Sequence, residues 1–235
     1  AMPDEAATAL PLLRQAVALE PDYAGAHGFL AWCHEILFVR GGFGEEDRVA
    51  ALRHARAAVT LGRDDATALA LGAFVIAMVE HDRPTAFEAF DQALALSPST
   101  SFTLFLGAIA LGYAGEAERA IEWGRRGLRI SPFDRLSYCA YHGIATGNFL
   151  LGRYDEAAMA GRRAVQLSPS FSVSHSLLVA PLVKLGRLAE ARAAAAEVIA
   201  LQPRFSAGGF CAALEMHPDL AAGLIEAWRA AGLPP

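Results

Sequence analysis

The sequence has no long apolar run, although 54% of its 235 residues are hydrophobic. A membrane-spanning helix needs about 20 consecutive apolar residues, and the apolar stretch 66–79 already ends at Glu80. The first residues also lack the lysines and arginines of a signal peptide, because Asp4 and Glu5 stand there instead. The sequence therefore predicts a cytoplasmic protein that has no membrane as a partner.

Cysteine and charge are scarce as well. Three cysteines (Cys33, Cys139 and Cys211) are an odd number without CxxC spacing, so we expect neither a disulfide framework nor a zinc ribbon. Charged residues make up only 19% of the chain, and the net charge of −5 argues against a protein built to grip phosphate backbones. The high apolar content excludes a disordered chain.

Alanine is what the sequence has in excess. About one residue in five is alanine, far above the average usage in globular proteins, and alanine is the best helix former. Valine, isoleucine and threonine are sparse outside a few windows, so strands are poorly supported. The composition therefore predicts an all-helical protein.

A helical hairpin recurs along the chain with a period near 34 residues. In each hairpin a glycine supplies the left-handed residue that ends the first helix, and acidic residues open the second helix. A proline then ends the second helix. One hairpin cannot bury its own apolar face, so neighbouring hairpins must stack. The glycines Gly115, Gly152 and Gly186 each stand 17 residues before Pro132, Pro169 and Pro203.

These markers resemble the tetratricopeptide-repeat (TPR) family, whose unit is a helix–turn–helix of 34 residues. The resemblance implies an all-α, right-handed superhelical solenoid that runs as a single array over residues 1–235. Its markers are strong over 101–203 and weaker before. The expected parts are a half-unit at 4–21, full units at 24–63, 66–98, 101–132, 135–169 and 172–203, a half-unit at 206–217 and a capping helix at 218–231.

The C-terminal phrases suggest a narrower resemblance. LGRLAEAR at 185–192, HPDL at 217–220 and AWRAAGLPP at 227–235 are similar to the tail of a bacterial group with these repeats. In that group the repeats follow either a class III adenylyl cyclase domain or a winged-helix DNA-binding domain. The resemblance implies the C-terminal part of a larger bacterial protein, and no catalytic or DNA-reading residue of those domains is present here.

Motifs that carry chemistry are weak throughout. Cys139 and His142 could share a helix face, but the other Cys–His pairs lie in distant units, so four zinc ligands do not converge. No GxSxG elbow occurs, and no Gly-Lys-Ser/Thr follows the glycines at 41–44. Arginines such as Arg125 stand among acidic residues, which indicates a solvated face and not a nucleic-acid site. We expect no catalytic residue, cofactor or metal, and no enzymatic activity.

A groove is the best functional candidate. In the TPR family the first helices of the units line a concave surface, and most residues that project onto it here are apolar. An apolar wall fits an amphipathic helix or an extended apolar segment, and aromatic anchors usually carry the binding energy. The candidate groove residues are Trp32, Leu71, Val75, Phe102, Phe105, Ile109, Tyr113, His142, Phe149, Val183 and Phe210.

The sequence thus predicts a non-enzymatic scaffolding module that binds a protein or peptide, or another copy of itself, in this groove. Two alternatives stay open. One is a regulatory domain of a signalling enzyme, such as an adenylyl cyclase, or of a transcriptional regulator. The other is a small-molecule sensor with a pocket around Cys139, His142 and Phe149.

Overall fold

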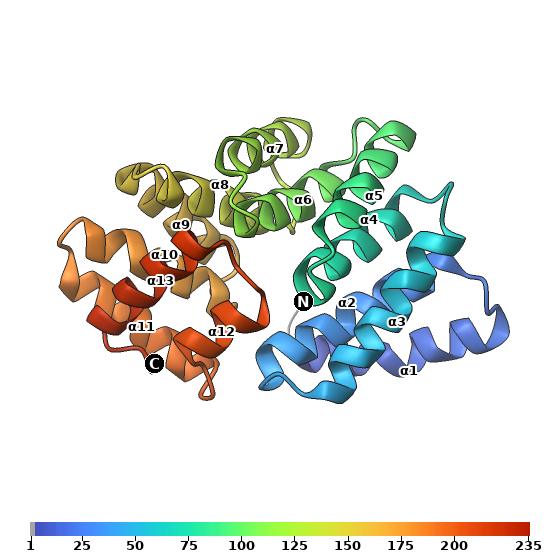
Figure 1. The fold of residues 1–235 in the computed structure, drawn as a ribbon, viewed down its shortest axis with the longest axis horizontal. Helices are drawn as coiled ribbons and strands as arrows, with labels where there is room; N and C mark the ends of the chain where they lie inside the picture. Colours follow the sequence, from blue (N-terminus) through green and yellow to red (C-terminus); the bar gives the residue numbers. More distant parts are fainter. Residues whose placement is uncertain (1–2) are drawn as a thin grey trace. The chain divides into compact units, whose positions relative to one another are not determined.

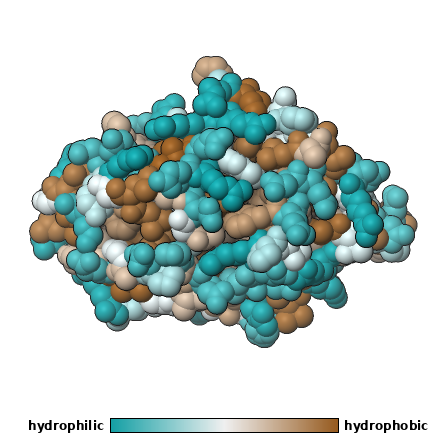
Figure 2. All heavy atoms as spheres, turned by 45° about the horizontal axis from the view of Figure 1, so that its top comes forward, coloured by the Kyte–Doolittle hydropathy of each residue, from teal (hydrophilic) through white to brown (hydrophobic). Residues whose placement is uncertain are grey.

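The computed structural model describes residues 3–235, and all regular secondary structure in this range is helical. The predicted all-α class is therefore confirmed. Successive helices form hairpins (Figure 1), and polar side chains surround apolar patches on the face shown in Figure 2. No described helix is long and apolar enough to cross a membrane. The helices are α1 (Pro3–Leu19), α2 (Ala24–Gly41), α3 (Glu45–Leu61), α4 (Ala66–Val75), the π-turn η1 (Ile76–Glu80), α5 (Arg83–Leu96), α6 (Ser101–Tyr113), α7 (Ala117–Ile130), α8 (Ser137–Leu150), α9 (Tyr154–Leu167), α10 (Ser172–Lys184), α11 (Leu188–Leu201), α12 (Ala207–Ala213) and α13 (Pro218–Ala230).

The described chain divides into two compact units, one that ends at Gly107 and one formed by Ala108–Pro235. In each unit two kinds of helix alternate. Helices α2 and α4 in the first unit, and α8 and α10 in the second, are apolar on nearly every side and bury most of their residues. A helix with apolar residues all round needs neighbours on several sides. The helices between them bury a single stripe and keep their charged face in solvent.

The stripes on these outer helices consist mainly of small residues, which let two helices lie close together. On α7, Ala120, Gly124 and Gly127 are buried against α8. A Cβ atom on Gly124 would stand 2.8 Å from the Ala140 carbonyl oxygen, so no larger residue fits without a shift of the helices. Alanine and glycine therefore set the spacing between the helices in the second unit.

The turns of the second unit follow the expected chemistry. Gly115, Gly152 and Gly186 have φ angles of +91°, +70° and +73°, the left-handed region that side chains disfavour. Each glycine follows a buried first helix and precedes an outer helix. The prediction that these three glycines end the first helices is confirmed.

Gly143 on α8 lies close against Ala108 on α6, so a larger residue at this position would crowd the contact. A Cβ atom there would lie 2.6 Å from the backbone and the side chain of Ala108. We expect Gly143→Ala to lower the free energy of unfolding by about 2–3 kcal/mol, because overpacking outweighs the gain of about 1 kcal/mol in helix propensity. Urea unfolding followed by circular dichroism measures this difference.

Gly208 is the matched control for this substitution. It also lies in a helix, α12, and its nearest neighbour beyond the helix is an atom of Pro235 at 4.0 Å. Gly208→Ala should leave the stability unchanged or raise it slightly. Equal effects of the two substitutions would show that crowding at Gly143 does not limit the packing of α8.

The end of the chain folds back on the second unit around Trp228 of α13. The indole Nε1–H of this fully buried residue donates a hydrogen bond to the Ser176 carbonyl oxygen at 2.7 Å. The ring also meets Phe205 and Phe210 edge-on, with centroids 5.4 and 6.0 Å away. Helix α13 thereby covers α10 and closes the apolar core of this unit.

Candidate functional site

Most of the predicted groove residues lie in the interior of the protein. Eight of the eleven are buried, and Leu71, Val75 and Phe105 have no accessible surface. A side chain in the core contacts its neighbours and cannot reach a partner in this conformation. These residues are buried because the first helices are apolar on nearly every side. The eight buried residues are Leu71, Val75, Phe105, Ile109, Tyr113, His142, Phe149 and Phe210.

The other three residues are partly exposed. Trp32 on α2 and Phe102 at the start of α6 belong to the first unit, and their rings meet edge-on with centroids 6.0 Å apart. Val183 lies near the end of α10 in the second unit. Trp32 and Phe102 therefore form the accessible part of the predicted site in the first unit.

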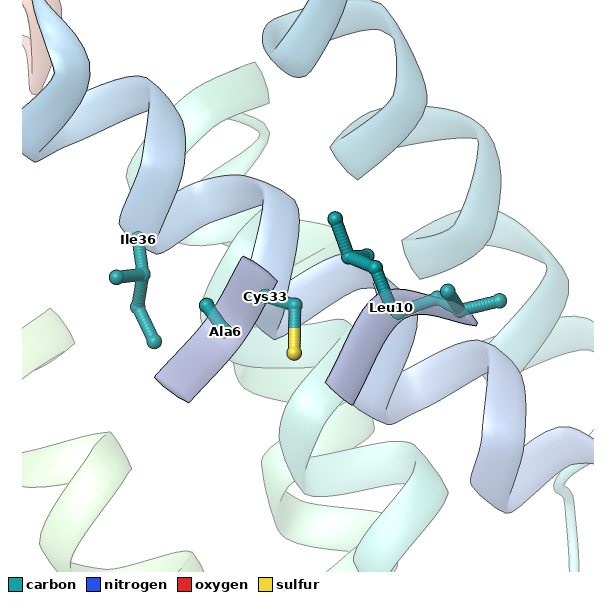
Figure 3. Close-up of a cluster of buried hydrophobic side chains, with 5 residues drawn as sticks. Ala6, Leu10, Cys33 and Ile36 are labelled. Carbon is teal, nitrogen blue, oxygen red and sulfur yellow. The ribbon is translucent and has the colours of Figure 1, made fainter. Parts of the chain in front are cut away.

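An apolar groove of about 370 Å³ opens beside Trp32, between α1 and α2. Among the described residues, Glu5 is the one charged residue that lines it. Beneath it lies a small apolar core, and Figure 3 shows Ala6 and Leu10 of α1 beside Cys33 and Ile36 of α2. We call this surface the α1–α2 groove, and its lining residues are Glu5, Ala6, Ala9, Leu12, Leu13, Phe29, Trp32, Cys33 and Ile36.

Large apolar side chains at the groove are unusually exposed. Leu12 is 69% exposed and Phe29 is 39% exposed, and the Phe29 ring lies 6.5 Å from that of Trp32. Phe29, Trp32 and Phe102 thus form a short row of aromatic rings at the surface of the first unit. Exposed apolar side chains that gather in one place mark an interaction surface more often than single ones do.

The sequence prediction named Trp32, but on a concave surface of first helices and not in this groove, and it named neither Leu12 nor Phe29. The predicted groove residues all come from residues 32–210, so none of them lies in the half-unit expected at 4–21, which contains Leu12. The signal that could have shown Leu12 is its place next to Leu13, because two adjacent leucines on a helix point in different directions. One of them then faces away from the core that the other one fills.

The alternative pocket around His142 is closed. His142 Nε2 lies 2.8 Å from Ser174 Oγ, which links α8 to α10, and the imidazole stacks on Phe171. A catalytic serine and its general base lie at a similar hydrogen-bond distance. Here, however, His142 is only 2% exposed and Ser174 is 0% exposed. Burial lowers the pKa of His142 to about 3, so the ring is neutral at pH 7. The pair holds two core helices together and is closed to substrate in this conformation.

Residues that could hold a metal ion or an anion occur in both units. No set of three or more His, Cys, Asp or Glu residues in the described part of the chain is placed to bind a metal ion. In the second unit, Arg125, Arg129 and Arg153 line a cavity of about 350 Å³ together with Glu118 and Glu122. Carboxylates and guanidinium groups therefore share this surface.

No family model matches the sequence, and no curated protein matches it. Solved structures do resemble the fold. One is human IFIT1 as a dimer with PPP-AAAA (TM-score 0.67, 17% identity, 83% of this chain and 45% of that chain). A second is the APC/C hetero-tetramer Cut9–Hcn1 (TM-score 0.67, 14% identity, 96% and 40%). A third is PilF of Pseudomonas aeruginosa (TM-score 0.57, 16% identity, 81% and 88%).

The extent of these matches limits what they show. The chain spans less than half the length of the matched IFIT1 and Cut9–Hcn1 chains. The identities of 14–17% carry no information about ligands or partners of this chain. The matches do cover most of this chain with TM-scores above 0.5. They establish an all-helical repeat fold of the tetratricopeptide type.

Proposed function

We propose that this chain is a protein-interaction module and that the α1–α2 groove of its first unit binds the apolar face of an amphipathic helix from a partner protein. The observation that carries the proposal is the position of Trp32. It is partly exposed between Phe29 and Phe102 and lines an apolar groove. A large, rigid aromatic side chain in this position is the usual anchor of a protein interface.

The shape and charge of the groove favour a helix as its occupant. The groove runs between two helices, and a third helix packs on such a surface by placing its ridges into the groove. Asp4 and Glu5 lie in the first turn of α1 at one end of it. We therefore expect a partner helix with an apolar stripe and a lysine or arginine that lies beside these carboxylates.

Two of the solved neighbours are seen with other molecules, and the two molecules differ in kind. Cut9 is seen with Hcn1, and IFIT1 is seen with PPP-AAAA. The carboxylates at the acidic end of the α1–α2 groove would repel a phosphate backbone. A site that binds phosphates needs positive charge, and the apolar lining of the groove supplies none. The groove therefore supports a protein partner.

Trp32→Ala provides the test of this proposal. We expect the parent chain to retain a partner from a lysate of the source cells, and the variant to bind that partner at least 30-fold more weakly. This loss corresponds to about 2 kcal/mol, the usual cost of removing an aromatic anchor. The helix of the retained protein is then synthesised and titrated by calorimetry. Phe105→Asp would be a poorer test, because Phe105 is fully buried and its replacement would unfold the chain.

Phe133→Ala is the matched control, since Phe133 is 97% exposed in the second unit. Phe133→Ala should bind the partner helix as the parent does.

Tryptophan emission adds a direct readout of binding at Trp32, because Trp123 and Trp228 are buried and Trp32 is not. A helix that binds Trp32→Ala as tightly as the parent would contradict the proposal. So would a Trp32-dependent dimer of the chain with no other partner, because a second copy would then occupy the groove.

The finer predictions from the sequence belong to the same proposal. We place the module in the cytoplasm of a bacterium, as a non-enzymatic single array of the repeat units given above. The alternative of a regulatory domain is supported by the C-terminal phrases alone. It predicts a class III adenylyl cyclase or winged-helix domain in the same reading frame, which the sequence of the gene would show.

A further inference from the structure

A second, larger cleft lies in the first unit, apart from the α1–α2 groove. It has a volume of about 650 Å³, within the range of small-molecule sites. Helix α2 forms its floor, and α1 and α3 form its walls. The apolar part of the lining is made of small and medium side chains. These residues are Val17, Ala18, Leu30, Val49 and Ala50, and the polar ones are Arg14, His34, Glu45, Glu46, Arg53 and His54.

A chain of hydrogen bonds that runs from Arg53 to Pro21 fixes His54, which lines the cleft. Arg53 Nη2 lies 3.0 Å from His54 Nε2, His54 Nδ1 lies 2.8 Å from His27 Nδ1, and His27 Nε2 lies 2.9 Å from the Pro21 carbonyl oxygen. A guanidinium can only donate and a carbonyl oxygen can only accept. His54 must therefore accept at Nε2 and donate at Nδ1, and His27 must accept at Nδ1 and donate at Nε2.

The electrostatics of the site agree with these tautomers. Burial, followed by the charge of Arg53, lowers the pKa of His54 to about 4, so its ring is neutral at pH 7. Arg14, which lines the cleft from α1, also lowers this pKa, by less than burial and Arg53 do. The cleft thus presents two permanent positive charges, one of them held by a neutral imidazole.

The carboxylates around the cleft cancel only part of this charge. Both oxygens of Glu45 accept hydrogen bonds from Arg48 at 2.7 Å, so this carboxylate is paired. Asp47, which accepts a hydrogen bond from His34 Nδ1 at 2.8 Å, does not line the cleft. Among the described residues, neither Arg14 nor Glu46 forms an ion pair. Among the described charged groups that line the cleft, Arg14, Arg53 and Glu46 are thus left without an ion pair, and two of these three are guanidinium groups.

We propose that this cleft binds a small organic monoanion, a carboxylate with an apolar body, held between Arg14 and Arg53. A guanidinium and a carboxylate form two parallel hydrogen bonds, which suits Arg for this task. The apolar body would lie against Leu30, Val17 and Val49. A polyphosphate would meet the carboxylates of Glu45 and Glu46, and like charges repel it. The site is distinct from the helix-binding groove and does not depend on it.

The test uses octanoate as the probe, with octanamide as its neutral analogue, in calorimetric titrations of the full chain. We expect octanoate to bind and octanamide to bind at least tenfold more weakly. Arg14→Gln and Arg53→Gln should each weaken octanoate about tenfold, the usual effect of losing a hydrogen bond to a charged group. Arg192→Gln, at an exposed position of α11, removes the same charge elsewhere and should have no effect.

Four results would overturn this site. One is the absence of octanoate binding, and another is equal binding by the parent and both arginine variants. The third is tighter binding of inorganic triphosphate than of octanoate. Trp32→Ala separates this site from the groove, because it should keep octanoate binding while it loses the partner helix. Loss of octanoate in Trp32→Ala alone would place the probe in the α1–α2 groove and contradict the assignment to the cleft. Circular dichroism of each variant confirms that it is folded.

Discussion

Replacing Trp228 with alanine should lower the free energy of unfolding by about 4–5 kcal/mol. Truncating a buried tryptophan costs about 3–5 kcal/mol through lost burial and the cavity that remains. The change also leaves the Ser176 carbonyl oxygen, 2.7 Å from the indole nitrogen, without this donor. An unsatisfied buried acceptor costs about 1–3 kcal/mol by itself, which places the expected loss at the upper end of the range for a truncated tryptophan. Urea unfolding of parent and variant, followed by circular dichroism, measures the difference.

Trp228→Phe separates the two contributions. It keeps most of the ring that contacts Phe205 and Phe210 but removes the hydrogen bond to Ser176. We expect a loss of about 1–3 kcal/mol from this variant. Leu12→Ala, at a residue that is 69% exposed, should change the stability very little. A Trp228→Ala variant within 1 kcal/mol of the parent would mean that α13 is not a structural part of the second unit.

The second large effect is expected from Glu35, a buried carboxyl group on α2. It is 7% exposed, and burial raises its pKa from 4.5 to about 8. The folded chain therefore keeps this proton between pH 4.5 and 8, whereas the unfolded chain loses it. The stability that the group contributes is complete below pH 4.5 and is lost as the pH rises through 8. Each pKa unit corresponds to about 1.4 kcal/mol, so the loss by pH 9 is on the order of 4 kcal/mol.

Glu35→Gln should remove this dependence, because the amide resembles the protonated acid and does not titrate. We expect the variant to gain roughly 4 kcal/mol over the parent between pH 5 and pH 9. The lowered pKa values of His54 and His142 make both the parent and Glu35→Gln less stable as the pH falls below 6.5. Because both proteins carry these histidines, their effect cancels in the difference between the two stability curves. Glu88→Gln, at an exposed position of α5, is the charge-matched control. Parallel stability curves for Glu35→Gln and the parent would show that Glu35 is ionised in the folded chain.

Local chemistry explains which parts of the fold could be predicted. The left-handed conformation of Gly115, Gly152 and Gly186 follows from the residue type and its place after a helix, so no tertiary information is needed. The all-helical class follows in the same way from the excess of alanine and the scarcity of β-branched residues.

Burial could not be predicted with the same success, because it depends on how many neighbours each helix receives. Phe102 and Phe105 lie three residues apart on α6, and the sequence assigned both to one groove. In the structure Phe102 is partly exposed beside Trp32, whereas Phe105 has no accessible surface. Periodicity gives the direction of a side chain around its helix axis, but not which directions are covered by other helices.

The sequence by itself determined the helical class, the repeat and its turns, because these depend on propensities and on spacings along one chain. The tertiary structure alone decided which apolar residues stay accessible at the α1–α2 groove. It also brought His27, His34 and His54 together with Arg14 and Arg53, although these residues are spread over α1, α2 and α3. A site assembled from three helices depends on their mutual packing, which no local pattern records.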